Sequence, residues 1–332
     1  METFVFAIFS FLFAFFVSLG LLAMVYKILK KVKAKQTIYE YVDMHKSKSG
    51  TPTMGGISFV LGASLSIVFL INGYFLPVII TVAVMLLNVM FGVYDDIIKI
   101  KKKQNGGLKP WQKLIMQTII FGGLGLLLYK LKLTNIIIPF FKTRINLGVF
   151  YPFIIVIIGL FFTNCTNLAD GLDGLECFIA TPSSVALGAI LLLISTSSNF
   201  DFVKNTSLLT NFGLISIIFS GAVFSFIFYN SHPAKIFMGD TGSLAIGGFL
   251  VAVGAVTGTI IYVLLFGFLF VLTGLSVMIQ VAYYKLTRKR VFLMAPLHHH
   301  FEKKGYHEAK IAVVYFVLTV IVSLIIILLE FL

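Results

Sequence analysis

Long apolar segments separated by short polar ones run through all 332 residues of the chain. The apolar segments lie at about 4–26, 55–71, 75–94, 114–129, 149–163, 177–197, 207–229, 242–259, 261–284 and 310–331. A helix of about 20 apolar residues crosses the hydrocarbon core of a bilayer and satisfies its own backbone hydrogen bonds. The pattern therefore predicts an all-α, polytopic membrane helix bundle of about ten transmembrane helices, in a single domain of residues 1–332.

The first apolar segment, Phe4–Tyr26, differs from a cleaved signal peptide. It is longer than the apolar core of such a peptide, its lysines follow it, and it has no A-x-A cleavage site. We expect it to be retained as the first transmembrane helix.

Lysines and arginines gather on one side of the predicted bundle. Of the 26 in the chain, 21 lie in or beside segments 27–54, 95–113, 164–176, 230–241 and 285–309. Cytoplasmic loops carry the excess of these residues, so we assign those segments to the cytoplasm and both termini to the opposite side. On that opposite side, residues 136–139 and 145–148 are rich in β-formers and are predicted to pair as a short hairpin.

Composition supports a membrane protein. The chain is 59% hydrophobic and 12% charged, with a mean hydropathy of +1.01, whereas soluble domains are about 25% charged. The net charge of +13 is mostly cytoplasmic lysine, which favours contact with anionic membrane lipid; no nucleic-acid partner is expected. Cys165 and Cys177 are too few for a disulfide framework and are expected to be small apolar fillers.

Ten of the 13 acidic residues also lie on the predicted cytoplasmic side. Five of them abut or interrupt apolar segments: Asp95, Asp96, Asp170, Asp173 and Asp240. An ionised carboxylate at such a place is costly unless it meets a cation, a hydrogen-bond donor or a metal ion. These aspartates predict a functional site at the cytoplasmic ends of the helices.

Asp95 and Asp96 end the third apolar segment, four and three residues before Lys99. On a helix Lys99 can reach both carboxylates, so a helix-end ion pair is the structural alternative to a catalytic role. Adjacent side chains on a helix point about 100° apart, which predicts different tasks for the two aspartates.

The segment 164–174 carries polar side chains at intervals of three residues. They are Asn164, Asn167, Asp170 and Asp173. On one unbroken helix these side chains would drift around the axis by roughly 60° a step. We therefore expect Gly171 and Gly174 to break the helix and let the polar groups converge; a simple polar turn is the alternative.

Asp240 precedes the eighth apolar segment, in the sequence Phe237-Met238-Gly239-Asp240-Thr241-Gly242. It is predicted either to cap that helix or to bring Mg²⁺ to phosphate groups at the helix N-terminus, and the two roles can coexist.

Three consecutive histidines, His298, His299 and His300, lie in the last cytoplasmic segment. Zinc is one possible partner, but consecutive ligands fit the usual zinc spacings poorly, so we favour imidazoles that face a phosphate. The basic, glycine-rich segment 48–56 lacks the residue order of a P-loop.

Together these motifs resemble the phospho-N-acetylmuramoyl-pentapeptide transferase family, within the polyprenyl-phosphate N-acetylhexosamine-1-phosphate transferase superfamily. The resemblance covers nearly the whole chain and rests on segments 48–56, 95–96, 104–108, 167–175, 237–240 and 296–302. It implies transfer of phospho-MurNAc-pentapeptide from UDP-MurNAc-pentapeptide to undecaprenyl phosphate, which yields lipid I and UMP for peptidoglycan synthesis, with Mg²⁺ as cofactor. It also implies a homodimer in the bacterial cytoplasmic membrane whose active site faces the cytoplasm.

The same resemblance implies roles for individual residues. Catalytic roles fall to Asp95, Asp96, Asp240, Lys48 and His298, and Mg²⁺ would be held by Asp240 and Asp170. Substrate-binding roles fall to Thr53, Asn164, Asn167, Asp170, Asp173, Asn230, Phe237, Lys99, Lys113, Gln280, His299 and His300. Phe237 would stack on uracil, and Lys48 would face phosphate. The chain departs from the family pattern at Ala169, Cys165-Thr166 and His232, beside the site, where donor affinity would be affected.

The chemistry of the acceptor bears on the role of Asp95. A phosphate monoester with a second pKa near 6 is mostly dianionic at pH 7, so a general base removes little of the barrier. We expect Asp95 to position Lys99, Mg²⁺ or the acceptor, while a covalent aspartyl-phosphate route stays open. The alternatives to this function are a sibling transferase that uses UDP-GlcNAc and, from another class, an ion-coupled transporter, whose carboxylates would lie mid-span.

Overall fold

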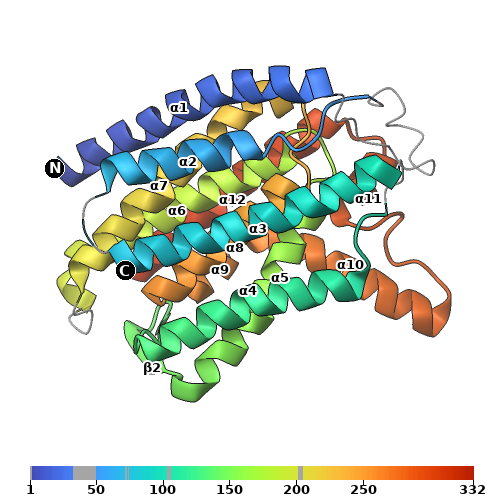
Figure 1. Ribbon diagram of the computed structural model, residues 1–332. Helices are drawn as coiled ribbons and strands as arrows, with labels where there is room; N and C mark the ends of the chain where they lie inside the picture. The colour runs from blue at the N-terminus through green and yellow to red at the C-terminus, as the bar shows by residue number, and fades with distance from the viewer. Residues whose placement is uncertain (1, 33–49, 72, 74, 103–105, 201–204) are drawn as a thin grey trace.

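The computed structural model describes residues 2–32, 50–71, 73, 75–102, 106–200 and 205–332 (Figure 1). Its helices are α1 Glu2–Val32, α2 Ile57–Leu70, α3 Phe75–Lys102, α4 Pro110–Lys130, α5 Tyr151–Ala169, α6 Leu175–Thr196, α7 Thr206–Asn230, α8 Asp240–Thr257, α9 Ile260–Phe266, α10 Phe268–Thr287, α11 Leu297–Lys303 and α12 Glu308–Phe331. Two strands, β1 Asn135–Ile138 and β2 Thr143–Asn146, complete it with two short 3₁₀ turns. The predicted all-α membrane bundle is confirmed.

Nine helices of the described ranges are long and apolar enough to cross a membrane, where about ten were predicted. The second apolar segment forms only α2, whose 14 residues span about 21 Å at 1.5 Å per residue. The ninth segment is broken into α9 and α10 at Gly267. A Cβ at Gly267 would lie 2.6 Å from the Phe162 ring, so the break lets α5 pack closely against this corner.

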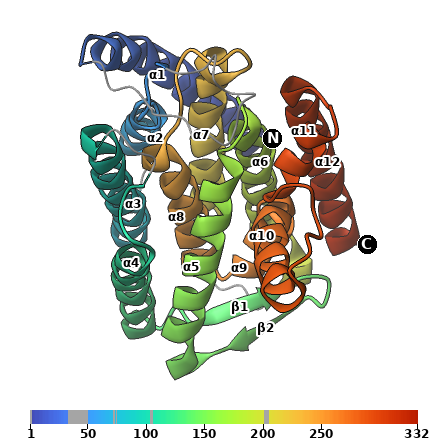
Figure 2. The same ribbon diagram turned by 90° about the vertical axis from the view of Figure 1, so that its right-hand side faces the viewer.

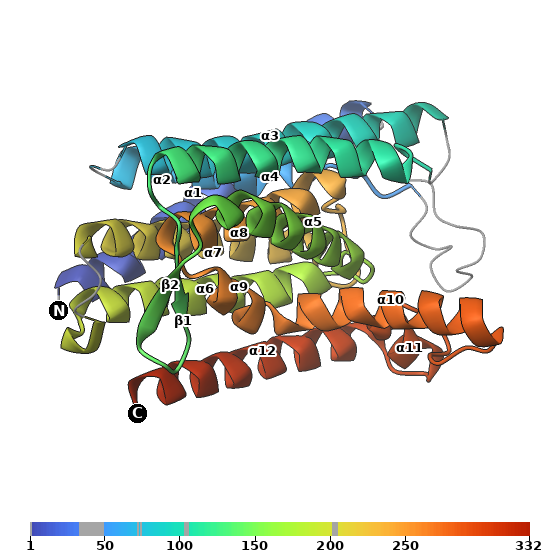
Figure 3. The same ribbon diagram turned by 90° about the horizontal axis from the view of Figure 1, so that it is seen from below.

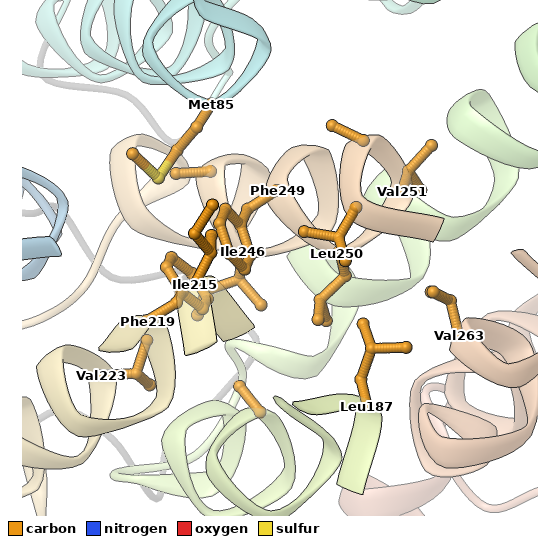
Figure 4. Packing of buried hydrophobic residues seen from close by; sticks show 14 of the residues in the cluster. Met85, Leu187, Ile215, Phe219, Val223, Ile246, Phe249, Leu250, Val251 and Val263 are labelled. Atoms are coloured by element: carbon orange, nitrogen blue, oxygen red, sulfur yellow. The ribbon is translucent and has the colours of Figure 1, made fainter. Parts of the chain in front are cut away.

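Helix α8 passes through the middle of the bundle, with α3, α5, α6 and α7 around it (Figure 2). All 18 residues of α8 are buried. Its glycines, alanines and serines leave room for neighbouring backbones, while its larger side chains fill the core. The rings of Phe249 and Phe219 stack 3.8 Å apart, and Ile246, Leu250 and Ile215 pack around them (Figure 4).

The predicted hairpin is confirmed. β1 and β2 pair antiparallel, with Asn135 opposite Asn146 and Ile138 opposite Thr143. The N–H of Ile137 donates to the carbonyl oxygen of Gly258 at 2.8 Å, which joins the hairpin to the end of α8. The hairpin thus closes one end of the bundle.

Both chain termini lie at the end of the bundle that carries the hairpin, and α11 lies at the opposite end (Figure 3). This agrees with the predicted sharing of one side by the two termini. Which membrane face that side meets remains a prediction.

Candidate active site

Close packing of α3 against α8 brings the candidate catalytic aspartates together. A Cβ at Gly92 would lie 2.3 Å from the backbone oxygen of Asp240, and a Cβ at Gly248 would lie 2.4 Å from the Asn88 amide. Only hydrogen fits at these two contacts. Asp95 and Asp96, one turn beyond Gly92 on α3, therefore reach the start of α8.

Asp96 caps α8 from outside the helix. Its carboxylate accepts hydrogen bonds from the N–H of Asp240 at 3.3 Å and from the N–H and hydroxyl of Thr241 at 3.1 and 2.8 Å. The N-cap residue is Gly239, which has a positive φ. Glycine has no side chain with which to cap the helix. The prediction that Asp240 caps the helix is therefore wrong: Asp96 supplies the anion that the helix N-terminus favours, and the Asp240 side chain is left for other contacts.

Two lysines bridge the aspartates at the end of the bundle. Lys99 Nζ lies 2.9 Å from Asp95 Oδ2, 3.5 Å from Asp96 Oδ1 and 2.7 Å from Asp240 Oδ1. Lys113, from α4, places Nζ 3.0 Å from Asp95 Oδ2 and 2.8 Å from Asp240 Oδ2. The expected reach of Lys99 to both neighbours on its helix is confirmed. Asp95 and Asp240 hold the two ammonium groups side by side.

The second oxygen of Asp95 is used by the backbone. Asp95 Oδ1 accepts a hydrogen bond from the N–H of Leu108 at 2.6 Å, and a Cβ at Gly107 would collide with this carboxylate at 2.3 Å. The side chain of Asp95 is fully buried. It is therefore fixed between two lysines and a loop, which fits a positioning residue.

The carboxylates of Asp95, Asp96 and Asp240 can each direct an oxygen to a common point, since these atoms lie within 4.8 Å of one another. Oxygen donors of this kind suit Mg²⁺. Asp170 is not part of this group; it follows α5 and accepts a backbone hydrogen bond from Gly239. Burial and then the charges of Asp240 and Asp96 raise the pKa of Asp170 well above its usual range.

The turn between α5 and α6 is broken as predicted. Helix α5 ends at Ala169, Gly174 has a φ of +75°, and α6 starts at Leu175. Asn167, on the last turn of α5, donates to the Ser243 hydroxyl of α8 at 2.8 Å. Asn167 thus contacts the first turn of α8 from a second side.

Asn230 and Asp173 tie this turn to the segment before α8. Asn230 is buried, accepts from the N–H of Gly174 at 3.1 Å and donates to the carbonyl oxygen of Ile236 at 2.9 Å. Asp173 accepts from the N–H of Ala234 at 3.0 Å. Since both polar ends of the Asn230 amide bind backbone, its contacts are those of a scaffold residue.

Phe237 and Thr53 are set by backbone pairing between segments 52–56 and 237–238. The N–H of Phe237 donates to the carbonyl oxygen of Pro52 at 2.8 Å, and its own carbonyl accepts from Gly55 at 3.0 Å. The Thr53 hydroxyl is buried and has no hydrogen-bond partner among the described residues. A Cβ at Gly239 would lie 2.8 Å from that hydroxyl and 2.6 Å from Asp96, so Thr53 stands beside the aspartates with its hydroxyl available.

The histidines of α11 lie over the turn after α5. A Cβ at Gly171 would lie 2.3 Å from His298 Nε2 and 3.2 Å from His299 Nε2. His299 Nδ1 is 2.8 Å from Glu302 Oε2, which directs its other nitrogen toward the turn. Among the described residues, the groups of three or more side chains that could share a metal ion do not include these histidines.

His300 faces a different part of the loop. Its Nδ1 accepts the N–H of Leu293 at 3.1 Å. Partial burial and the Lys304 charge lower the pKa of His300.

Two predicted site residues, Asn164 and Gln280, make their hydrogen bonds to residues other than the aspartates. Asn164 donates to Gln117 of α4 at 2.9 Å. Gln280 accepts from the N–H groups of Val291 and Phe292 at 3.1 and 2.9 Å and so fastens the loop after α10. Lys48 lies outside the described residues.

Sequence reasoning missed several residues that complete the site. Thr241 and the backbone of Leu108 bind the aspartate pair, Ser243 binds Asn167, and Glu302 orients His299. The signal for Thr241 was its position directly after Asp240 at the start of an apolar segment. The signal for Glu302 was its three-residue spacing from His299 on a helix.

Comparison with known proteins agrees with this geometry. Residues 76–259 match glycosyl transferase family 4, and residues 48–60 match the phospho-N-acetylmuramoyl-pentapeptide-transferase signature 1. Proteins named phospho-N-acetylmuramoyl-pentapeptide-transferase from Clostridium novyi and Campylobacter lari are 40% and 39% identical to the chain. These alignments cover 96% of the chain and 95% and 92% of the two relatives, and one from Aliarcobacter butzleri is 37% identical over 95% of the chain and 91% of its own length. The predicted resemblance is confirmed: the chain belongs to glycosyl transferase family 4 and, within it, to the phospho-N-acetylmuramoyl-pentapeptide-transferase family.

Proposed function

We propose that the protein transfers phospho-MurNAc-pentapeptide from UDP-MurNAc-pentapeptide to undecaprenyl phosphate, forming lipid I and UMP for peptidoglycan synthesis. The observation that carries this proposal is the pair of lysines, Lys99 and Lys113, held between Asp95 and Asp240 at the end of the bundle. Such a pair meets the demand of a reaction between two anionic phosphates. The names of the relatives supply the transferred group, phospho-N-acetylmuramoyl-pentapeptide.

The chemistry requires alignment more than proton transfer. An oxygen of the acceptor phosphate forms a bond to the sugar-bearing phosphorus, and the bond from that phosphorus to the bridging oxygen of UMP breaks. The acceptor is already mostly dianionic at pH 7, so no proton has to leave it. Lys99 and Lys113 offset the charge of the phosphates, and Asp95 keeps the two ammonium groups in place.

Mg²⁺ fits the donor set of the site, since its oxygens are those this ion prefers. Asp240 would hold it, with Asp170 approaching from the turn after α5 as the second ligand. When bound, it supplies positive charge that neutralises the phosphates. Thr53, Asn167, Asp173 and Phe237 lie on the segments around Asp240 and would contact the donor, with Phe237 stacked on uracil and His298 and His299 facing phosphate.

The cellular setting follows from the same proposal. The protein would act as a homodimer in the bacterial cytoplasmic membrane. The α3–α8 site would face the cytoplasm, because the donor is a soluble nucleotide and the basic residues gather on that side. An ion-coupled transporter is less well supported, since Asp240 is the first residue of α8 and Asp95 lies on the last third of α3.

The test is release of UMP by the purified protein. The full chain is incubated with Mg²⁺, undecaprenyl phosphate and either UDP-MurNAc-pentapeptide or UDP-GlcNAc, with Asp240→Asn as the control for background hydrolysis. We expect release with the MurNAc donor alone. Release with UDP-GlcNAc only would assign the sibling activity, and release with neither donor would refute the proposed function.

A further inference from the structure

A second cluster of charged side chains lies beside the candidate active site. His232, in the segment between α7 and α8, places Nδ1 3.2 Å from Asp173 Oδ2 and in direct contact with Glu308 Oε1. The side chains of Asp173 and Glu308 are 2% and 9% exposed, whereas that of His232 is 29% exposed. A single nitrogen, His232 Nδ1, thus contacts the buried carboxylates of Asp173 and Glu308, which come from different parts of the chain.

The cluster joins three elements. Asp173 belongs to the turn after α5, which also carries Asp170, and Glu308 is the first residue of α12. The ring of His307 packs edge-on against His232 with centroids 4.9 Å apart, while its own Nδ1 accepts the N–H of Ala309 and caps α12. The turn after α5 is therefore fastened to the beginning of the last helix.

The same turn also lies close to the histidines of α11, because His298 and His299 approach Gly171. α11 and Glu308 belong to one continuous segment, 297–308. This segment contacts the turn at two points: directly at Gly171, and at Asp173 through His232. Loss of His232 would remove the bridge between Asp173 and Glu308 and would leave these two carboxylates without the imidazole between them.

We propose that His232 is a positioning residue for the sugar-nucleotide donor: by bridging Asp173 and Glu308, it holds the turn 170–174 in the conformation that binds the donor. This inference rests on the proposed function, since it assigns the turn to the donor. His232 itself touches no reacting atom. Its effect falls on donor affinity and leaves the chemical step to the lysines and aspartates around Asp240.

The test separates donor binding from turnover. UMP release by wild type, His232→Ala and His232→Lys is measured with UDP-MurNAc-pentapeptide varied at saturating undecaprenyl phosphate, and then with the acceptor varied. A hydrogen bond to a charged group is lost in His232→Ala, so we expect the donor KM to rise about 10- to 100-fold. Because the lost interaction is made equally in ground and transition states, kcat and the acceptor KM should stay within about threefold. His232→Lys supplies a cation and should recover part of the loss.

His307→Asn is the matched control. Asparagine keeps a good N-cap for α12 but removes the ring that packs on His232, and its donor KM should stay near the wild-type value. Binding of UMP, followed by calorimetry, and thermal unfolding of each variant are measured in parallel. If His232→Ala does not fold, Glu308→Gln tests the same bridge from the other side, and a raised donor KM is again expected.

The outcomes distinguish this inference from the function on which it rests. An active wild type with an unchanged donor KM in His232→Ala and Glu308→Gln overturns the positioning role alone. So does a fall in kcat with an unchanged KM. A wild type that neither releases nor binds UMP overturns the proposed function, and the inference with it.

Discussion

Replacement of Asp95 by asparagine separates a positioning aspartate from a general base. Asp95 Oδ2 accepts a hydrogen bond from Lys113 and forms an ion pair with Lys99 at 2.9 Å, while Oδ1 accepts a hydrogen bond from the N–H of Leu108. An asparagine of the same shape must point its NH₂ group at either the lysines or Leu108, so a donor faces a donor in both orientations. Hydrogen bonds to charged groups contribute about 1.5–3 kcal/mol each. In the orientation that turns the NH₂ group toward the lysines, loss of both lysine contacts would cost about 3–6 kcal/mol, or roughly 10²- to 10⁴-fold in kcat/KM at 1.36 kcal/mol per decade.

The assay is UMP release by Asp95→Asn, Lys99→Ala and the double variant between pH 6 and 9. If Asp95 acts through Lys99, the double variant should lose much less than the product of the two single losses. The pH profile of Asp95→Asn should also run parallel to that of the wild type. The reasoning is refuted if Asp95→Asn binds Mg²⁺ and both substrates normally yet loses the chemical step together with one limb of the pH profile.

Three further predictions follow from the described contacts. Asp96→Ala removes three hydrogen bonds and the cap of α8. We expect thermal unfolding to show a free energy of unfolding lower by about 3–5 kcal/mol than that of the wild type, and Asp96→Asn should show a smaller decrease. Glu176→Leu should raise the unfolding temperature, since the buried Glu176 carboxyl has no hydrogen-bond partner among the described residues and such a group costs about 1–3 kcal/mol; a lower unfolding temperature would contradict this. The lowered pKa of His300 means that the folded loop resists protonation, so its stability should fall as the pH drops below about 6.5; proteolysis of segment 288–296 should detect this, and His300→Gln should abolish the pH dependence.

The membrane fold was largely predictable because every segment of a helical bundle that crosses the lipid must be long, apolar and helical. Long apolar segments gave the helices, and the Gly171 and Gly174 pair gave the break between α5 and α6. The break at Gly267 was not predicted, since a single glycine inside an apolar segment has no local polar signal. It depends on the Phe162 ring of another helix.

The sequence allowed us to predict which residues belong to the site better than which residues they contact. The pairing of Asp95 and Asp96 with Lys99 is local to one helix and could be read from spacing. The contact of Lys113 with Asp240, across two helices, and the capping of α8 by Asp96 are set by close packing at Gly92, which no spacing rule encodes. For the same reason Asp240 was wrongly predicted to cap its own helix.

The short helix α2 has a consequence for the lipid beside it. Its outward side chains Leu61, Leu65, Val68 and Phe69 are exposed, yet its 14 residues offer about 21 Å of apolar length to a bilayer whose hydrocarbon core is about 30 Å thick. Acyl chains next to α2 must compress or tilt, at a fraction of a kcal/mol per Å of mismatch. The segment that leads into α2 pairs with the strand of chain before Asp240. Under the proposed function, a thinner leaflet at this point would bring the phosphate of a lipid acceptor closer to Lys99 and Lys113.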